Sequence, residues 1–305
     1  MTRVVVAGAG SIGSLLAGHL AQVAEVTVLT RREEHATALR ENGLRVSGRG
    51  DFTAQLAATA DPFRLPEDTE LAILACKGTD LEPLAATLEG RLPSATVMTI
   101  QNGLGAEEVV AAHVDRVIRG TTFPAGKIIE PGHVQWDVKG DTTIGPFEER
   151  PAPFADVQRL ADACTRAGMP THAVEDARGP QWRKVIFNAS TNPIGALTGL
   201  THGRVCERPD LRALVSGLVN EGKAVAAAQG IELDSDPEAL IDHAAKPEVA
   251  YGHKASMLQD VEARRTTEID YLNGGIVRFG LEHDVPTPLN EAIWALVKGV
   301  EDSWH

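Results

Sequence analysis

In its first half the chain alternates short apolar runs with stretches whose apolar residues recur every three or four positions. A short run of β-branched and aliphatic residues is typical of a strand buried on both faces, whereas the second spacing is typical of a helix that packs on one side. The strands predicted in this way are residues 4–6, 25–29, 71–75 and 96–100, and the helices are 15–20, 33–42, 81–88 and 106–113. This order predicts an α/β fold with an N-terminal, Rossmann-type parallel sheet.

The pattern predicts further elements up to residue 174. The alternation in residues 44–58 suits small extra strands. Residues 117–145 are expected to form an antiparallel extension of strands, interrupted by glycines such as Gly120, Gly126 and Gly140. A helix at 154–167 and a last short strand at 171–174 complete this half.

Beyond residue 174 the pattern becomes helical, and no strand–helix–strand unit recurs. The predicted helices are 182–192, 209–229, 237–245, 256–282 and 288–300. A chain of 305 residues is also longer than one typical hydrophobic core supports. We therefore expect two domains, a dinucleotide-binding domain at 1–174 and an all-α domain at 175–305 that closes over the edge of the sheet.

A glycine-rich turn joins the first predicted strand to the first helix. Its residues are Gly8, Ala9, Gly10, Ser11, Ile12 and Gly13. In a dinucleotide site the first glycine makes the tight turn, the second lets the backbone approach the pyrophosphate, and the third allows close packing of helix and strand. The spacing alone also fits an ordinary glycine-rich turn, but the preceding strand and the following helix favour dinucleotide binding.

Polar residues follow two other predicted strands at their carboxyl ends, where parallel sheets bind ligands. Lys77 would place a cation near the phosphates or ribose of the cofactor, and Asn102 would form hydrogen bonds at the nicotinamide end, where Gly103 allows a close approach. Considered singly, Lys77 also fits a solvated loop and Asn102-Gly103 an ordinary turn. Because both residues are expected at the same edge of the sheet, a functional role is favoured.

The end of the second strand bears on the choice between NAD and NADP. NAD sites have an acidic residue there for the ribose 2′-hydroxyl, whereas a 2′-phosphate requires an arginine. Thr30 and Arg31 occupy this place, and Glu33 and Glu34 come later, where they suit the first turn of a helix. We therefore expect NADP, although Arg31 also fits a solvated position before a helix.

Three polar residues in the first helix of the second half are spaced four apart. Lys184, Asn188 and Asn192 would line one helix face, which suits either a ligand site or a solvated face. Pro193 follows directly, so we expect Asn192 at a bend or a helix end.

The predicted helix 256–282 carries a carboxylate on an apolar stripe. The stripe comprises Leu258, Val261, Arg265, Glu268, Leu272 and Gly275 or Ile276. Glu268 needs a partner in such a setting, and a lysine in a cleft is a natural one. Ser256 and Gln259 at the start fit a capping box, which gives Ser256 a purely structural alternative.

Composition and charge narrow the class of function. The hydrophobic share of 43% and charged share of 23% are those of an ordinary globular protein. The formal net charge of −13 argues against nucleic acid or an anionic membrane as a partner. The three widely spaced cysteines suggest neither disulfides nor a metal site. The strand begins next to Met1, which leaves no room for a signal peptide, and no apolar run reaches membrane-spanning length, so we expect a cytoplasmic protein.

Taken together, these motifs resemble the ketopantoate reductase (2-dehydropantoate 2-reductase) family over nearly the whole chain. The matching segments are 8–13, Lys77, 101–103, 120–122, 131–132, 182–184 with Asn188 and 192–193, 256–260 and 267–270. Lys184 and Glu268 both lie in matching segments, and the resemblance implies Lys184 as the general acid and Glu268 as its partner.

The resemblance also implies the ligand-binding residues. Asn188, Asn192 and Ser256, together with Asn102, would bind the substrate. NADPH would be held by residues 8–13 with Arg31, Lys77, Asn102 and the region around Ala125. The chain departs from the family near His202, where some members have an asparagine that contacts the substrate.

The implied activity is NADPH-dependent reduction of 2-dehydropantoate (ketopantoate) to pantoate in pantothenate biosynthesis. Hydride transfer to a keto carbon creates alkoxide charge that a lysine ammonium can stabilise and protonate. The alternatives are another small 2-oxo acid, the reverse oxidation of a 2-hydroxy acid with NAD, and a module that senses NADP without turnover. The long apolar C-terminal helices are compatible with a homodimer.

Overall fold

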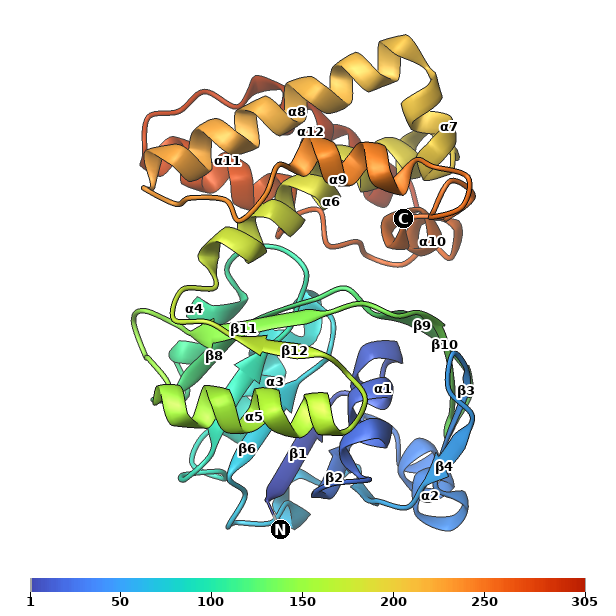
Figure 1. Ribbon diagram of the computed structural model, residues 1–305, viewed down its shortest axis with the longest axis vertical. Helices are drawn as coiled ribbons and strands as arrows, with labels where there is room; N and C mark the ends of the chain where they lie inside the picture. Colours follow the sequence, from blue (N-terminus) through green and yellow to red (C-terminus); the bar gives the residue numbers. More distant parts are fainter. Residues whose placement is uncertain (1, 305) are drawn as a thin grey trace. The chain divides into compact units, whose positions relative to one another are not determined.

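The computed structural model describes residues 2–304 and divides the chain into two compact units. The first unit comprises the chain up to Gln101 and Ala106–Ala177, and the second comprises Asn102–Gly105 and Arg178 onward. The first contains all the strands and the second is helical, as the colours from blue to green and from yellow to red show (Figure 1). The predicted α/β fold with a helical C-terminal part is confirmed.

The first unit is built on an eight-stranded sheet with the order β12-β11-β8-β7-β6-β1-β2-β5. Its strands are β1 (Arg3–Ala7), β2 (Glu25–Leu29), β5 (Ala57–Thr59), β6 (Leu71–Leu74), β7 (Thr96–Thr99), β8 (Val117–Thr122), β11 (Thr142–Pro146) and β12 (Thr171–Ala173). All neighbours pair in parallel except β11 with β8. The four strands predicted in the first hundred residues are confirmed to within one residue at each end.

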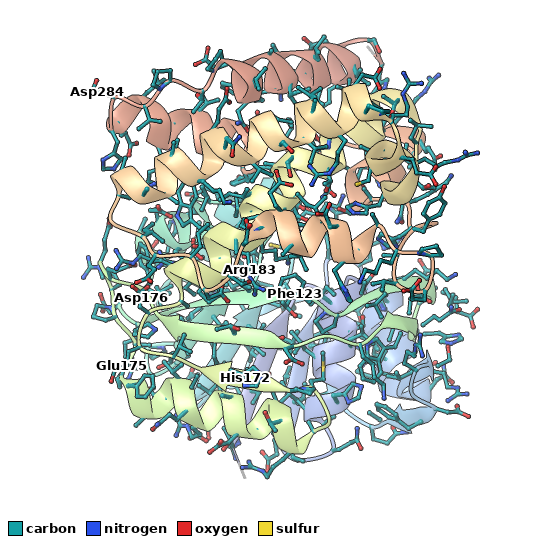
Figure 2. The ribbon with its side chains drawn as sticks, turned by 45° about the horizontal axis from the view of Figure 1, so that its top comes forward. Phe123, His172, Glu175, Asp176, Arg183 and Asp284 are labelled. Atoms are coloured by element: carbon teal, nitrogen blue, oxygen red, sulfur yellow. The ribbon has the colours of Figure 1, made fainter. Side chains whose placement is uncertain are left out.

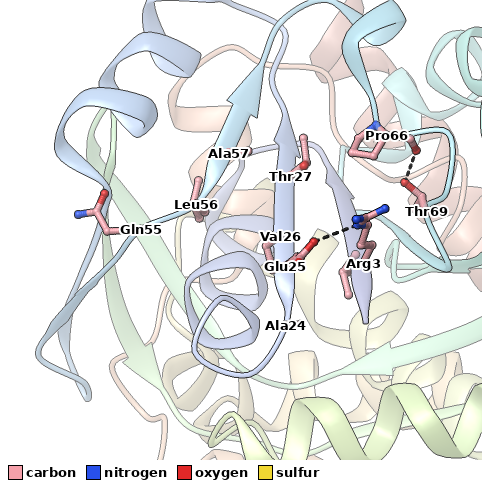
Figure 3. A pocket seen from close by; sticks show the side chains of 11 residues that line it. Arg3, Ala24, Glu25, Val26, Thr27, Gln55, Leu56, Ala57, Pro66 and Thr69 are labelled. Atoms are coloured by element: carbon pink, nitrogen blue, oxygen red, sulfur yellow. Dashed lines mark hydrogen bonds and ion pairs between the residues drawn. The ribbon is translucent and has the colours of Figure 1, made fainter. Parts of the chain in front are cut away.

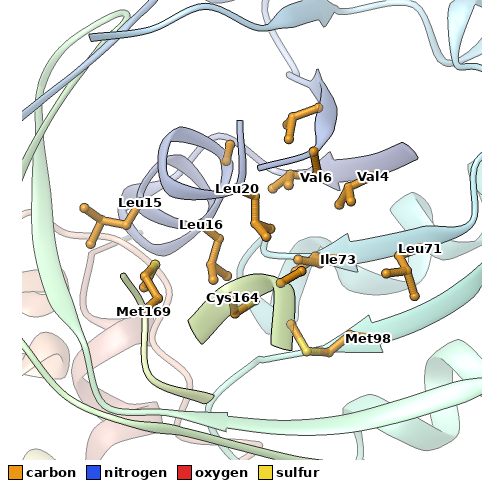
Figure 4. Packing of buried hydrophobic residues seen from close by; sticks show 14 of the residues in the cluster. Val4, Val6, Leu15, Leu16, Leu20, Leu71, Ile73, Met98, Cys164 and Met169 are labelled. Atoms are coloured by element: carbon orange, nitrogen blue, oxygen red, sulfur yellow. The ribbon is translucent and has the colours of Figure 1, made fainter. Parts of the chain in front are cut away.

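Alternate residues of β1 face two different hydrophobic layers. Val4 and Val6 belong to a cluster with residues of α1 (Ser11–Leu20) and α5 (Phe154–Arg166), as the close view shows (Figure 4), and with residues of α2 (Glu33–Asn42). Val5 and Ala7 pack with α3 (Leu81–Leu88) and α4 (Ala106–Ala111) on the other face. Burial on both faces explains why β1 is an uninterrupted apolar run.

A second, smaller sheet has the order β4-β3-β10-β9. It joins β3 (Leu44–Gly48) and β4 (Phe52–Ala54) to β9 (Ala125–Glu130) and β10 (His133–Val138), and β10 pairs with β3 in parallel. The antiparallel extension predicted for residues 117–145 is therefore only partly right. β8 continues the parallel sheet and β11 is antiparallel to it, but β9 and β10 belong to the smaller sheet. Pairing between distant strands decides this, and it leaves no local signature.

The second unit consists of seven helices within the described residues. They are α6 (Arg178–Thr198), α7 (His202–Glu207), α8 (Pro209–Ala228), α9 (Pro237–Ala244), α10 (Ser256–Glu262), α11 (Asn273–Glu282) and α12 (Pro288–Asp302). The short helix α7 was not predicted. The core of this unit includes Ile186 and Ala189 of α6, Val215 of α8 and Ile276 of α11.

The continuous helix predicted for residues 256–282 is wrong. α10 ends at Glu262 and α11 begins at Asn273, so Glu268 lies in a turn and not on a helical stripe. Arg264 adopts a left-handed φ of 49°, and the Arg265 N–H bonds to the Asp260 carbonyl at 2.9 Å, which is the Schellman pattern of a helix end. The capping box at Ser256 is also wrong, because the N-cap is Ala255 and forms no side-chain bond.

The predicted helix end at Asn192 is wrong as well, because α6 continues through Pro193 to Thr198, whereas the alternative of a bend there stays a prediction. A proline inside a helix has no N–H to donate to the carbonyl four residues earlier, which here belongs to Ala189. The side-chain amide of Asn273 on α11 donates to that carbonyl at 3.0 Å. A tertiary hydrogen bond thus replaces the missing helical bond and allows the helix to continue.

Candidate active site

The glycine turn after β1 has the geometry of a phosphate cradle. Gly8 has a φ of +107°, and a Cβ there would lie 2.6 Å from the Cys76 nitrogen. A Cβ on Gly13 would lie 1.9 Å from the Gly8 carbonyl oxygen, whereas Gly10 faces open space, with its nearest atom at 3.9 Å. α1 starts at Ser11 with no side-chain cap and no acid in its first turn, so its N-terminal N–H groups can receive an anion. These residues fit a dinucleotide pyrophosphate.

Arg31 and the Lys77 loop follow the carboxyl ends of two strands on either side of β1. Arg31 follows β2, and its side chain is 84% exposed and lies 3.4 Å from Asp80. Lys77 is half-buried and precedes a short 3₁₀ turn, Gly78–Asp80. The Arg31–Asp80 ion pair is exposed and therefore weak, so a phosphate can replace Asp80 as the partner of Arg31.

The predicted cofactor residue Ala125 starts β9, which packs on α1. A Cβ on its neighbour Gly126 would lie 3.2 Å from Leu15 of α1. Ala125 is half-buried, as are Ala9, Ser11 and Ile12 in the glycine turn. β9 therefore runs alongside the helix whose N-terminus belongs to the cradle.

Gln101 has a structural role that the sequence analysis did not assign. Its side-chain amide donates to the carbonyls of Leu74 at 2.8 Å and Cys76 at 3.0 Å, and its Oε1 accepts from the Ile100 N–H at 3.2 Å. The buried side chain thus ties the end of β7 to the end of β6. The only signal in the sequence was its place just before Asn102-Gly103.

Residues Asn102–Gly105 leave the sheet and pack with the helical unit. The Leu104 N–H donates to the Tyr271 carbonyl at 2.8 Å, and Gln181 of α6 donates to the Gly103 carbonyl at 3.3 Å. Gly103 has a φ of +106°, and a Cβ would lie 2.4 Å from the Tyr271 oxygen. Only glycine fits at this position without a shift of the backbone.

This packing places Asn102 between the two residues predicted to be catalytic. Lys184 Nζ donates to Asn102 Oδ1 at 2.8 Å, and Asn102 Nδ2 donates to Glu268 Oε2 at 3.0 Å. All three residues are half-buried, and they come from α6, from the loop 102–105 and from the turn between α10 and α11. The structure thus connects Lys184 and Glu268 through one amide.

The electrostatics of this group suit proton transfer. Burial lowers the pKa of Lys184 from 10.5 to about 8, and the charge of Glu268 opposes that shift. The amine is therefore protonated at neutral pH but releases its proton more readily than an ordinary lysine. A group of this kind can stabilise and protonate an oxyanion. Arg183, the preceding residue on α6 (Figure 2), pairs instead with Asp234 at 2.9 Å.

The remaining predicted substrate residues belong to the same unit. Asn188 and Asn192 are buried on α6, one and two turns beyond Lys184. Ser256 is exposed at the start of α10, whose N-cap Ala255 would lie 3.9 Å from a Cβ on Gly195 of α6. The structure shows hydrogen bonds that join Lys184, Asn102 and Glu268, and it places the other three along or beside α6.

His202, where the chain departs from the family, is half-buried among the helices of the second unit. Its Nε2 lies 3.1 Å from the Ile241 carbonyl, and its ring lies 5.5 Å from that of Phe187. Burial lowers the pKa of His202, so the ring is neutral at pH 7. These contacts give it a role in packing α7 against α6 and α9.

The first unit has a pocket of about 390 Å³ (Figure 3), and its lining includes no residue of the glycine turn. It is lined by Arg3 and Glu25 at the amino ends of β1 and β2, whereas the glycine turn follows the carboxyl end of β1. Arg3 is already bonded to Glu25 at 2.9 Å, so this hollow offers no free cation to an anionic ligand. Within residues 2–304, no group of His, Cys, Asp or Glu residues is arranged to hold a metal, and no helix is both long and apolar enough to cross a membrane.

Comparison with known proteins places these features in a family. The family model "Ketopantoate reductase PanE/ApbA" matches residues 4–149, and its C-terminal counterpart matches residues 176–301. The chain is 32% identical to the 2-dehydropantoate 2-reductase of Pyrococcus abyssi over 300 residues, which is 98% of each chain.

Two solved structures share the fold over 99% of both chains. One is a PanE/ApbA family ketopantoate reductase from Ralstonia eutropha JMP134, with a TM-score of 0.89 and 30% identity. The other is D-mandelate dehydrogenase in a ternary structure with NADH and anilino(oxo)acetate, with a TM-score of 0.89 and 27% identity. Because both halves match the family models and a relative above 30% identity covers nearly the whole chain, this protein is an oxidoreductase that belongs to the ketopantoate reductase family.

Proposed function

We propose that this protein reduces 2-dehydropantoate to pantoate with NADPH, and that Lys184 is the general acid. The observation that carries the proposal is the hydrogen-bonded series Lys184–Asn102–Glu268. Asn102 follows directly on Gln101, which ties the carboxyl ends of β6 and β7 together. The series is thus linked through the chain to the edge of the sheet where such folds bind dinucleotides.

The cofactor proposal rests on the cradle at Gly8–Gly13 and on Arg31. When bound, NADPH supplies the hydride, and the protein supplies binding and orientation. The N–H groups at the start of α1 would hold the pyrophosphate, and Lys77 would add positive charge nearby. No acidic residue occupies positions 30–32 at the end of β2, which favours a 2′-phosphate partner for Arg31 over a free 2′-hydroxyl.

In the proposed mechanism the helical unit holds the substrate and manages the proton. The ammonium of Lys184 donates a hydrogen bond to the keto oxygen and gives it a proton as alkoxide charge develops. Glu268 keeps the lysine protonated, because its charge opposes the lowering of the lysine pKa by burial. Asn188, Asn192 and Ser256 would hold the polar groups of the substrate.

A second candidate function is dehydrogenation of another small 2-hydroxy acid, with NAD as the acceptor of the hydride. The D-mandelate dehydrogenase neighbour favours it, since it has the same fold over 99% of the chain. A non-catalytic NADP sensor is less well supported, because a sensor does not require a buried lysine joined to a carboxylate through an amide. A homodimer remains part of the proposal and is testable by analytical ultracentrifugation.

The test is steady-state oxidation of NADPH with ketopantoate, followed at 340 nm, with phenylglyoxylate and NADH as the competing pair. We expect the highest kcat/KM for ketopantoate with NADPH. Lys184→Ala should bind NADPH normally and lose about two to four decades of kcat. Turnover of Lys184→Ala near that of the wild type would contradict the acid role, and preference for phenylglyoxylate with NADH would favour the second candidate.

A further inference from the structure

Glu268 lies in a turn that the last helix of the chain holds from both sides. The residues immediately before and two after it, Thr267 and Asp270, are bonded to side chains of α12. We use "267–270 turn" for this segment. The proposed partner of the general acid therefore owes its position to a helix that carries no residue of the proposed site.

Glu301 is the main contact on the N-terminal side of the turn. Its Oε1 accepts hydrogen bonds from both the N–H and the Oγ1 hydroxyl of Thr267, each at 2.7 Å. The same hydroxyl accepts from the Ile269 N–H at 3.2 Å. The hydrogen bonds of Thr267 thus involve the N–H groups of the residues directly before and after Glu268.

Two further residues of α12 hold the other side of the turn. Trp294 Nε1 donates to Asp270 Oδ1 at 2.7 Å, and Lys298 Nζ lies 3.1 Å from Asp270 Oδ2 and 3.0 Å from Glu301 Oε2. Spacings of four and three residues place Trp294, Lys298 and Glu301 on one face of the helix. One face of α12 therefore contacts both ends of the 267–270 turn. We call these hydrogen bonds and ion pairs the α12 contacts.

The position of Glu301 would be unfavourable for a carboxylate without these contacts. It lies in the last turn of α12, where the negative end of the helix dipole disfavours a carboxylate. It is also only 7% exposed, so its charge is largely removed from water. The two donors of Thr267 and the ammonium of Lys298 compensate for both penalties. The burial of Glu301 at this position is therefore coupled to the hydrogen bonds that it accepts from Thr267.

We propose that Glu301 is a positioning residue for the reaction: through Thr267 it fixes Glu268 where it can bond Asn102 and, through Asn102, act on Lys184. The kinetic consequence of this inference rests on the proposed function, but the α12 contacts themselves do not. Loss of the α12 contacts would let Glu268 move from its position, in which Oε2 lies 3.0 Å from Asn102 Nδ2. Misplacement by about 1 Å of a group in an active site can reduce turnover by about 100-fold.

The test compares four variants of the full-length enzyme. Glu301→Gln removes the charge at nearly constant shape, and Thr267→Val removes the Oγ1 hydroxyl, which gives a second probe should the first variant not fold. Thr267→Ser restores the hydroxyl. Asp302→Asn is the matched control, since it removes an exposed carboxylate from the next position of the same helix.

We expect Glu301→Gln and Thr267→Val to lower kcat by about 10- to 100-fold and to leave the KM for NADPH within twofold of the wild type. In these two variants the fall of kcat/KM at alkaline pH (the alkaline limb) should begin at lower pH. The reason is that Lys184 loses the nearby charge of Glu268, which opposes the lowering of the lysine pKa by burial. Thr267→Ser and Asp302→Asn should keep the wild-type kcat and the wild-type limb. An unmoved limb in folded Glu301→Gln and Thr267→Val would overturn the proposal, whatever the size of the loss in kcat.

Hydrogen exchange separates failure of this inference from failure of the proposed function. If the wild type does not oxidise NADPH with ketopantoate, the proposed function fails. The effect of the α12 contacts on the 267–270 turn can still be measured. Amides of residues 264–272 should exchange at least tenfold faster in Glu301→Gln than in the wild type or in Asp302→Asn. Equal exchange in all three would overturn the positioning role independently of any assay of turnover.

Discussion

Replacing Lys184 by methionine should make the protein more stable at neutral pH while it abolishes turnover. The pKa of Lys184 is lowered from 10.5 to about 8 by burial. A pKa difference of one unit corresponds to about 1.4 kcal/mol, so the folded state disfavours the charged lysine by about 3 kcal/mol. Methionine fills similar space without a charge, but it loses the bond to Asn102, worth about 1 kcal/mol. The expected net gain at pH 7 is about 2 kcal/mol.

The sign of the pH dependence follows from proton binding. Between pH 8 and 10.5 the unfolded chain keeps the proton on Lys184 and the folded chain has released it. The free energy of unfolding of the wild type therefore rises with pH in this window, by up to about 3 kcal/mol, and that of Lys184→Met lacks this contribution. The two stability curves should cross, and at pH 10.5 the variant should be less stable than the wild type by about 1 kcal/mol, the value of the lost hydrogen bond.

Urea unfolding at pH 7 and pH 10 measures this difference. Tryptophan fluorescence suits the assay, because Trp182, Trp294 and Trp304 belong to the helical unit. Lys223→Met is the matched control, since Lys223 lies on α8 in a more exposed ion pair with Asp236. It should change stability by less than about 1 kcal/mol at either pH. A Lys184→Met variant that is less stable than the wild type at pH 7, by an amount that does not vary with pH, would refute the reasoning.

Three further predictions concern the cofactor, the glycine turn and the coupling within the site. Arg31→Ala should weaken NADPH binding by about 1.5–3 kcal/mol and leave NADH binding nearly unchanged, as measured by fluorescence titration; equal losses would exclude a 2′-phosphate contact. Gly13→Ala should abolish dinucleotide binding and lower the melting temperature, because its Cβ would lie 1.9 Å from the Gly8 oxygen; a variant that binds NADPH normally would disprove this packing. Lys184→Ala and Glu268→Ala should reduce kcat non-additively, since both bond Asn102, and strict additivity would show that they do not act as a unit.

Local sequence patterns were sufficient for most of the first unit. A buried parallel strand must be apolar on both faces, and a turn that brings backbone against backbone must be glycine, so β1 and the turn after it are visible in residues 3–13. The bounds of α2 and α3 match the prediction residue for residue for the same reason. Each element satisfies its own steric and burial requirements from residues adjacent in the chain.

Helix ends were less predictable where the usual signal residues were absent or overridden. Arg264 and Asp284 adopt left-handed φ values of 49° and 56° at the ends of α10 and α11, positions that glycine usually occupies (Asp284 is labelled in Figure 2). Conversely, Pro193 did not end α6, because Asn273 from another helix supplies the missing donor. In each case the local preference of the residue was outweighed by contacts elsewhere in the fold.

The candidate site divides in the same way. The sequence by itself indicated that Glu268 needs a partner, and the family resemblance implied Lys184 as the general acid with Glu268 as its partner. Only the tertiary structure decided that Asn102, 82 residues before one and 166 before the other, joins them. It also decided that Thr267, the neighbour of Glu268, is bonded to Glu301 of the last helix. Contacts at such separations arise from the packing of whole elements, and because no periodicity in the chain records which elements will meet, the sequence pattern alone could not supply them.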